Sequence, residues 1–94
     1  MWFTYVLKSR KTGKFYAGYT SDVERRLLYH NAKLGGAFTS RNAPFDLVYY
    51  EAFLSKNDAM REEKFLKSGK GREFFREKIK CSLKIIDENQ VSPP

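Results

Sequence analysis

The only histidine of the chain, His30, follows Arg26 by four residues, so the two side chains share one face of any helix that contains them. An arginine offers a fixed fork of donors to an anion, and a histidine can take or give a proton near neutral pH. Val23 and Leu27 mark the buried side of this helix, and Arg26 and His30 fall beside that apolar arc. The pair could therefore form one side of a site for an anionic group. The alternative is that His30 is an ordinary histidine on a helix surface.

A carboxylate on a later helix, Glu63, falls near the middle of an apolar arc, whereas Glu62 falls towards its edge. That arc is set by three residues, Ala59, Met60 and Leu66. A carboxylate on an inward face is costly unless it is paired or binds a cation. Two interpretations stay open. Glu63 forms a structural ion pair with a residue such as Arg26, or it is the ligand of a divalent metal ion such as Mg²⁺, which prefers oxygen donors.

The composition indicates one small domain. The chain has 94 residues, of which 41% are hydrophobic and 16% aromatic, and this suits a single core. One cysteine cannot form a disulfide within the chain, and one cysteine with one histidine cannot supply a four-ligand Cys/His zinc site. The net charge of +7 indicates a polyanionic partner, most simply nucleic acid. The alternative is a small protein that is merely soluble and basic.

The hydropathy pattern gives no sign of a membrane. No apolar run approaches the roughly 18 residues that a transmembrane helix needs. The N-terminus also lacks the basic region, apolar core and cleavage site of a secretory signal. We therefore expect a cytoplasmic location and no membrane partner.

Runs rich in aromatic and β-branched residues predict three strands, at residues 1–8, 14–19 and 45–53. The polar segment 9–13 ends in glycine and predicts a hairpin loop between the first two strands. The register of this hairpin decides whether Tyr5 and Tyr16 share a sheet face. They do so only if residues of opposite parity lie across from each other, for example if Tyr5 faces Tyr16.

The first predicted helix follows the second strand. Its cap is one of three polar residues, Thr20, Ser21 or Asp22. Ser21-x-x-Glu24 has the capping-box pattern, and Gly35-Gly36 is expected to stop the helix. Residues 37–44 are expected to be irregular.

Two further helices are predicted after the third strand. The first covers residues 55–68, and Gly69-Lys70-Gly71 interrupts the chain before the second, which covers residues 72–80. The second should turn three apolar residues inward, Phe74, Phe75 and Ile79. Residues 81–86 fit either a helix extension or a short strand, and residues 87–94 are expected to fray. The order ββαβαα predicts an α/β protein of the α+β type, with a small, mainly antiparallel three-stranded sheet flanked by helices.

Five elements in order resemble the GIY-YIG nuclease family. Tyr5 is followed eleven residues later by Tyr16-Ala17-Gly18, and then come Arg26, His30 and Glu63. Tyr5 stands where the family has the tyrosine of Gly-Ile-Tyr, and Tyr16-Ala17-Gly18 stands where it has Tyr-Ile-Gly. The chain is similar to a small stand-alone bacterial member, related to the nuclease domain of the bacterial excision-repair endonuclease. The resemblance would make residues 1–80 the nuclease-like domain and residues 81–94 a partly frayed C-terminal extension.

The resemblance implies a divalent-metal-dependent endonuclease that hydrolyses DNA phosphodiester bonds with one Mg²⁺ or Mn²⁺ ion. Glu63 would hold the metal, and Arg26 would neutralise charge that develops on the phosphate. His30 would assist Tyr5, and Tyr16 would lie close to the attacking water or its metal. The substrate would be DNA rather than RNA, in a branched or damaged form that arises in repair or recombination. For each tyrosine the alternative is ordinary packing.

The chain departs from the family pattern at two points. Phe3 replaces the glycine of the first motif, which matters little because the tyrosine carries the chemistry. Many family nucleases also carry an asparagine beyond the glutamate, where this chain has Phe, Arg, Glu and Lys at residues 75–78. The second departure bears on catalytic efficiency more than on reaction type.

Basic residues are predicted to contact phosphates rather than base edges, which gives salt-dependent binding with little sequence preference. They are Lys8, Arg10, Lys11, Lys14, Arg41, Lys64, Lys67, Lys70 and Arg72. For any single one of them the alternative is a solvated surface.

Two other functions compete with the endonuclease. One is a catalytically weak nucleic-acid-binding module of the same fold. The other is a structural or interaction domain in which the Tyr, Arg, His and Glu side chains form an internal polar network.

Overall fold

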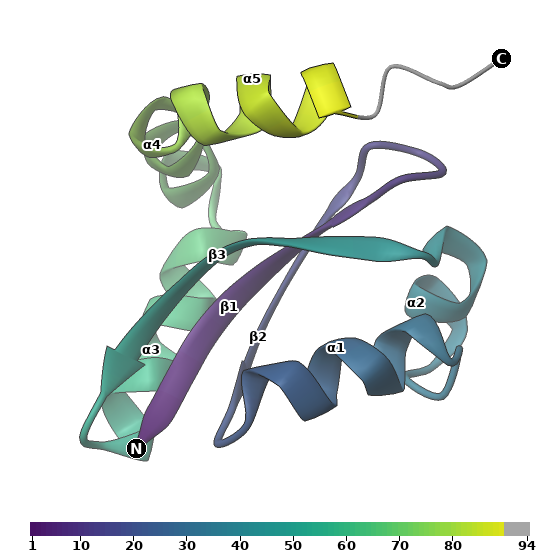
Figure 1. Cartoon of the computed structure of the whole chain (residues 1–94). Helices are drawn as coiled ribbons and strands as arrows, with labels where there is room; N and C mark the ends of the chain where they lie inside the picture. The colour runs from purple at the N-terminus through teal and green to yellow at the C-terminus, as the bar shows by residue number, and fades with distance from the viewer. Residues whose placement is uncertain (90–94) are drawn as a thin grey trace, which may run out of the picture.

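A three-stranded antiparallel sheet forms the centre of the computed structural model, which describes residues 1–89. Its strands are β1 (Trp2–Ser9), β2 (Phe15–Thr20) and β3 (Phe45–Phe53), in the spatial order β2-β1-β3 (Figure 1). The predicted fold class is confirmed, and the ends of the three predicted strands are correct to within one residue.

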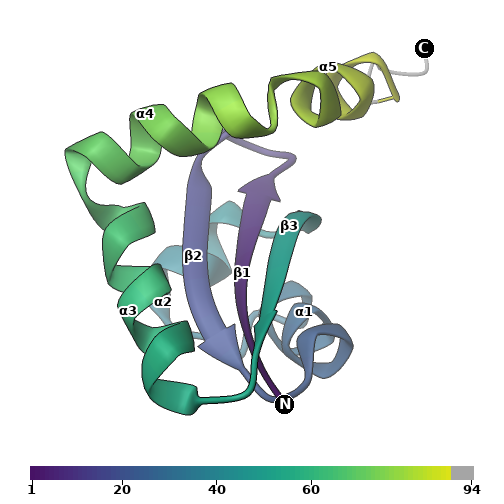
Figure 2. The same cartoon turned by 90° about the vertical axis from the view of Figure 1, so that its left-hand side faces the viewer.

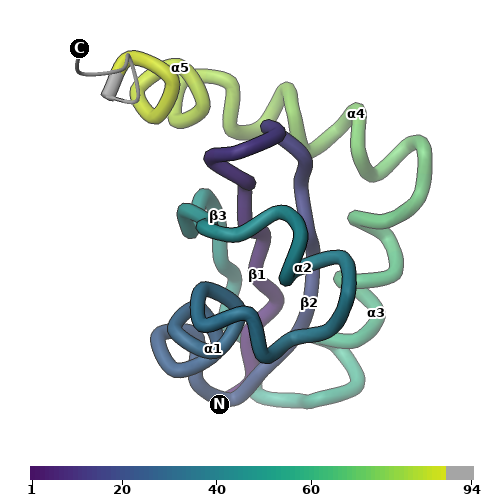
Figure 3. Tube along the Cα trace, turned by 90° about the vertical axis from the view of Figure 1, so that its right-hand side faces the viewer, coloured from purple at the N-terminus to yellow at the C-terminus, as the bar shows by residue number. Residues whose placement is uncertain are grey.

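Helices cover both faces of the sheet. On one face lie α1 (Val23–Asn31) and α2 (Ala37–Asn42), which are nearest the viewer in Figure 3. On the other lies α3 (Lys56–Lys67), beside the edge strand β2 (Figure 2). The last two helices, α4 (Gly69–Lys78) and α5 (Lys80–Asn89), run across one end of the sheet (Figure 2). Within the described part of the chain, no helix has the length and apolar character that a bilayer crossing requires.

The strand alternation divides the core into two layers. Val6 on β1 faces α3 and α4, and its buried neighbours are Ala17, Leu66, Phe75 and Ile79. Tyr5 and Leu7 point the other way, towards α1, and share a cluster with Ala43 and Phe45. Tyr5 therefore lies inside the layer between the sheet and α1.

The hairpin register places Tyr5 and Tyr16 on the same face. Tyr5 lies across from Gly18, and Leu7 lies across from Tyr16. Residues of opposite parity do face each other, so the stated condition for a shared face is confirmed. The example pair was wrong by two positions, because Tyr5 faces a glycine rather than Tyr16.

The start and end of α1 differ in detail from the prediction. Of the three candidate caps, Asp22 is the one used, and its carboxylate accepts a hydrogen bond of 3.0 Å from the backbone N–H of Arg25. The capping box that begins at Ser21 is therefore not the motif at this end. The helix ends at Asn31, and Lys33 follows with a φ of 63°, so the chain has left the helix before Gly35.

The expectation of an irregular segment at residues 37–44 was wrong, because α2 lies within it. This helix has only six residues, and its N-cap, Gly36, has no side chain to signal a helix start. It is held by buried polar residues instead. Asn42 donates a 2.7 Å hydrogen bond to the carbonyl of Phe38 and accepts one of the same length from Thr12.

The break between α3 and α4 is narrower than predicted. Ser68 alone separates the two helices, and its hydroxyl accepts a hydrogen bond from the N–H of Gly71. Gly69-Lys70-Gly71 therefore forms the first turn of α4 and not an interruption. A Cβ at Gly71 would overlap the carbonyl of Phe65, so this glycine permits the close approach of the two helices.

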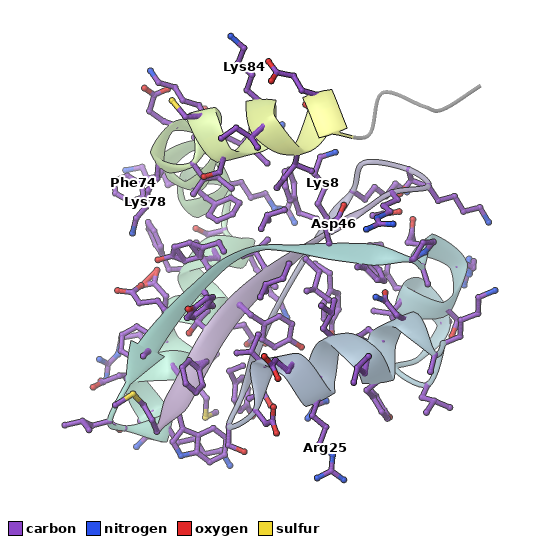
Figure 4. All side chains as sticks on the ribbon, in the orientation of Figure 1. Lys8, Arg25, Asp46, Phe74, Lys78 and Lys84 are labelled. Atoms are coloured by element: carbon purple, nitrogen blue, oxygen red, sulfur yellow. The ribbon has the colours of Figure 1, made fainter. Side chains whose placement is uncertain are left out.

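The inward positions of α4 were predicted correctly for Phe75 and Ile79 and wrongly for Phe74. Phe74 is 59% exposed, because residues four apart share a helix face and the adjacent position points elsewhere. Figure 4 shows Phe74 on the outer side of α4.

Residues 81–86, for which the sequence fits either a helix or a short strand, are helical and belong to α5. Residues 87–89, expected to fray, are helical too, and Asp87 pairs with Lys8 at 3.3 Å. The rest of the predicted frayed end lies outside the described residues. The element order is therefore ββααβααα, with two helices more than the predicted ββαβαα.

Candidate active site

Tyr5 lies at the centre of the site, on the middle strand of the sheet. Its hydroxyl lies 3.1 Å from Nε2 of His30, and both residues are only 2% exposed. A Cβ at Gly18, the register partner of Tyr5, would overlap the Tyr5 hydroxyl. The glycine of the second motif thus makes room for the phenol of the first.

His30 is the one buried residue of α1, and it is enclosed by rings. The ring of Tyr16 meets it edge-on with centroids 5.0 Å apart, and Tyr29 and Phe45 lie close by. A Cβ at Gly35 would overlap Nδ1 of His30, so the turn after α1 closes directly over the imidazole. Nδ1 is buried without a hydrogen-bond partner among the described residues.

The charges of Arg26 and Glu63 both act on the Tyr5 hydroxyl. Burial raises the pKa of Tyr5 well above its ordinary value; the neighbouring Tyr16 adds to that increase, Arg26 opposes it, and Glu63 raises it further. Arg26 comes from α1 and Glu63 from α3, so helices from opposite faces of the sheet both place charge near this phenol. At neutral pH Tyr5 therefore keeps its proton.

His30 is neutral at neutral pH. Burial lowers the pKa of His30, and the positive charge of Arg26 lowers it further. A neutral imidazole has one nitrogen that accepts, so Nε2 can take the proton of the Tyr5 hydroxyl while Nδ1 carries the other hydrogen.

The Glu63 carboxylate is largely covered, with its side chain 18% exposed, and it pairs with Lys67 at 3.2 Å. Among the described residues, the ion-pair partner of Glu63 is thus Lys67 and not Arg26, the example considered from the sequence. The Lys67 ammonium also lies 5.9 Å from the centre of the Tyr16 ring, which links Glu63 to the tyrosine side of the site. Arg26 packs over the ring of Tyr29, 5.4 Å from its centre.

The donor set suits a hard divalent ion. In the described part of the chain, no three His, Cys, Asp or Glu side chains come together as a metal cluster. Glu63 offers one carboxylate, and its present partner is a lysine on the next turn, half of whose side chain is exposed. Mg²⁺ is commonly bound by one or two carboxylates and keeps several waters, so Glu63 fits the role of its protein ligand.

The predicted phosphate-binding residues fall into two groups. Lys8, Arg10 and Lys67 are paired with acidic side chains, Arg10 with Asp46 at 2.7 Å. Figure 4 shows Lys8 and Asp46 near each other towards the hairpin end of the sheet. The other predicted residues are exposed, and they are Lys11, Lys14, Arg41, Lys64, Lys70 and Arg72.

The sequence did not indicate a role near the site for three residues, Gly35, Phe38 and Arg76. Gly35 was assigned to a helix stop, although its role is to leave room for His30. Phe38 stacks on Tyr16 with centroids 5.9 Å apart, and it lies on the helix that was not predicted. Arg76 lies over the ring of Phe15, a contact that only the packing of α4 on β2 creates.

The three-stranded sheet and the helices around it form a nuclease-type fold. The sequence matches the GIY-YIG catalytic domain over residues 1–78, and the chain belongs to the GIY-YIG family. The resemblance drawn from the order of residues is thereby confirmed. Nucleases of this family generally use a divalent metal ion and act on nucleic acid.

Its relatives include proteins named UPF0213. That of Staphylococcus haemolyticus is 40% identical over 86 residues, which cover 92% of this chain and 94% of the relative. That of Bacillus pumilus is 44% identical over 59 residues, which cover 63% of this chain and only 59% of the relative. The solution NMR structure of the UPF0213 protein BH0048 from Bacillus halodurans is 40% identical, with 80% of this chain and 82% of that chain covered and a TM-score of 0.49.

Proposed function

We propose that the protein is a divalent-metal-dependent endonuclease that hydrolyses DNA phosphodiester bonds. Its catalytic residues would be Tyr5, Tyr16, Arg26, His30 and Glu63. The observation that carries the proposal is the buried contact between the Tyr5 hydroxyl and Nε2 of a neutral His30, with Arg26 and Glu63 both acting on the same hydroxyl.

Tyr5 acts as a proton relay in this proposal. Because its pKa is raised by burial, a free phenolate is too rare at neutral pH to serve as the base. Instead, the proton of the attacking water moves to the Tyr5 oxygen while the Tyr5 proton moves to Nε2 of His30. The water becomes the nucleophile, its oxygen forms the new bond to phosphorus, and the 3′ oxygen leaves with the bonding pair. Tyr16, which borders His30, orients that water.

Arg26 and Glu63 handle the charges of the reaction. The Arg26 guanidinium neutralises charge that develops on the non-bridging phosphate oxygens. Glu63 holds Mg²⁺ or Mn²⁺, which when bound would polarise the phosphate and stabilise the departing oxygen. Lys67, now paired with Glu63, is released to a phosphate of the substrate.

The substrate is DNA rather than RNA, in a branched or damaged form of the kind that repair and recombination produce. Exposed cations, Lys14, Lys64 and Arg72 among them, contact its phosphates. The second candidate is a nucleic-acid-binding module of the same fold with little catalysis, and the absence of an asparagine at residues 75–78 favours it.

The test is nicking of supercoiled and branched DNA in Mg²⁺ or Mn²⁺ by matched variants. Glu63→Gln and Arg26→Ala should each reduce the rate by about a hundredfold or more, the usual size of such losses. Glu62→Gln and Arg25→Ala are the controls, since Figure 4 shows Arg25 pointing away from the sheet. Circular dichroism confirms that each variant is folded. Activity that survives both site variants rules out these residues, and salt-sensitive binding without cleavage supports the second candidate.

A further inference from the structure

A cavity of about 590 Å³ is lined by Tyr16 but by none of the other four proposed catalytic residues. It lies along the edge strand β2, and its walls come from the hairpin loop, α2, α3 and α4. Its size is that of a cleft that binds a small molecule or one nucleotide.

Aromatic rings form much of the cavity wall. Tyr16 and Phe38 are stacked, with centroids 5.9 Å apart and planes at 25°, and Phe38 is 40% exposed. Phe15 and Phe75 form the inner part, edge-on to each other at 5.8 Å. Flat apolar walls of this kind accept the face of a nucleobase, because every base has a π-face that stacks on an aromatic ring.

The rim is positively charged. Lys14, Lys67, Arg72 and Arg76 line the cavity, and of the described residues that line it none is acidic. The Arg76 guanidinium lies 5.1 Å from the centre of the Phe15 ring, so it connects the aromatic wall of the cavity with its basic rim. The charge suits the phosphates on either side of a base that enters the cavity.

We propose that this cavity receives an unpaired nucleobase of the DNA strand next to the phosphate that is cut. The inference rests on the proposed function, and it adds the substrate class: DNA with an unpaired nucleotide beside the cleavage point. Tyr16 carries the argument, because one ring borders both the cavity and His30. A base inside a duplex is stacked and paired, so only an unpaired or extruded base can enter such a pocket.

The test uses the Glu63→Gln variant, which leaves the DNA uncut, and a fluorescent DNA duplex that carries a single-stranded arm. Abasic residues replace the first few unpaired positions of the arm one at a time, which removes the base and keeps the phosphate charge. At one position the abasic probe should bind about tenfold more weakly, in line with the contribution of one stacked base. A blunt duplex, which has no unpaired base, should bind as weakly as that abasic probe.

A matched pair of phenylalanine variants locates the effect. Phe38→Ala, made in the Glu63→Gln background, removes one wall of the cavity, and the difference between intact and abasic probes should fall to less than about twofold. Phe74→Ala is the control, since Phe74 is 59% exposed and lies on the outside of α4 (Figure 4). This control should leave the difference unchanged.

The inference and the proposed function fail differently. If DNA binds but no abasic position matters, or if Phe38→Ala and Phe74→Ala behave alike, the base pocket is overturned while the nuclease assignment stands or falls on the nicking assay. If no DNA probe binds at all, both are overturned.

Discussion

The hydroxyl of Tyr5 is a buried polar group that hydrogen-bonds Nε2 of His30. Its placement follows from the register opposite Gly18 and from the capped helix that carries His30. At the scale of single residues, the proposed chemistry therefore depends on one oxygen atom. Removing that atom is the most direct perturbation of the site.

We expect Tyr5→Phe to abolish cleavage while leaving the fold intact. The ring keeps its packing, and leaving Nε2 of His30 buried without this partner costs about 1–3 kcal/mol of stability. Denaturant unfolding and nicking rates measure the two effects separately. Tyr50→Phe is the control. Tyr50 is the residue of β3 that lies opposite Tyr5 in the sheet, but its side chain is 59% exposed. Equal activity in the two variants would remove Tyr5 from the mechanism.

The burial of His30 predicts a pH dependence of stability. Burial and then Arg26 lower the pKa of His30 in the folded chain, whereas the unfolded chain binds this proton near pH 6.5. Between those two values the unfolded state holds more protons at this residue. The contribution of His30 to the free energy of unfolding is therefore complete above about pH 6.5. It declines as the pH falls towards the pKa of His30 in the folded chain.

Chemical denaturation at pH 7 and pH 5 tests this expectation. The wild-type chain should lose more stability over that interval than His30→Gln, since carboxylates contribute equally to both proteins. A pH dependence that is the same in the two proteins would mean that His30 is not buried in its neutral form.

At the scale of elements, the turn between α1 and α2 fixes the imidazole in place. We expect Gly35→Ala to displace His30 from Tyr5, because the added Cβ would overlap Nδ1. Cleavage should fall by at least about tenfold, since misplaced catalytic groups cost that much or more. Gly69→Ala, at a glycine with open space around it, is the matched control. The His30 ring protons in NMR spectra report the displacement directly.

The elements that could be predicted from sequence are those with their own local signals. The third strand, residues 45–53, was predicted without error because aromatic and β-branched residues fill it. In contrast, α2 was missed because its start has neither a side-chain cap nor an apolar repeat, and its stability comes from buried Thr39 and Asn42. Phe74 and Phe75 are adjacent and chemically identical, and only the packing of α4 distinguishes them.

The candidate site residues divide in the same way. Arg26, His30 and Glu63 could be selected from helical periodicity and from the order of motifs. The contact of Tyr5 with His30 needed the hairpin register, which no local pattern fixes. Lys67 follows Glu63 by four residues on the same helix, so this pairing could have been expected from the spacing alone. Phe38 as the partner of Tyr16 depends instead on how α2 packs against β2.

At the scale of the whole molecule, the net charge of +7 predicts steep salt dependence of DNA binding. If about four phosphates are neutralised, the logarithm of the association constant should fall with the logarithm of salt concentration with a slope of about −4. Lys14→Ala should reduce the slope by about one, because Lys14 borders the proposed cavity. Lys84→Ala is the control, since Figure 4 shows Lys84 pointing outward from α5. Affinity that barely changes with salt would argue against a phosphate-contacting surface.

The central position of β1 has a consequence for hydrogen exchange. Its backbone is paired with β2 and β3, and helices cover both of its faces, so its amide hydrogens should exchange only through global unfolding. The α3 helix has a solvent-facing side and belongs to no sheet, so it can open in smaller, more frequent fluctuations. Partial opening of the native state could thus move Glu63 away while Tyr5 is still in place, and the domain would then lose its proposed metal ligand.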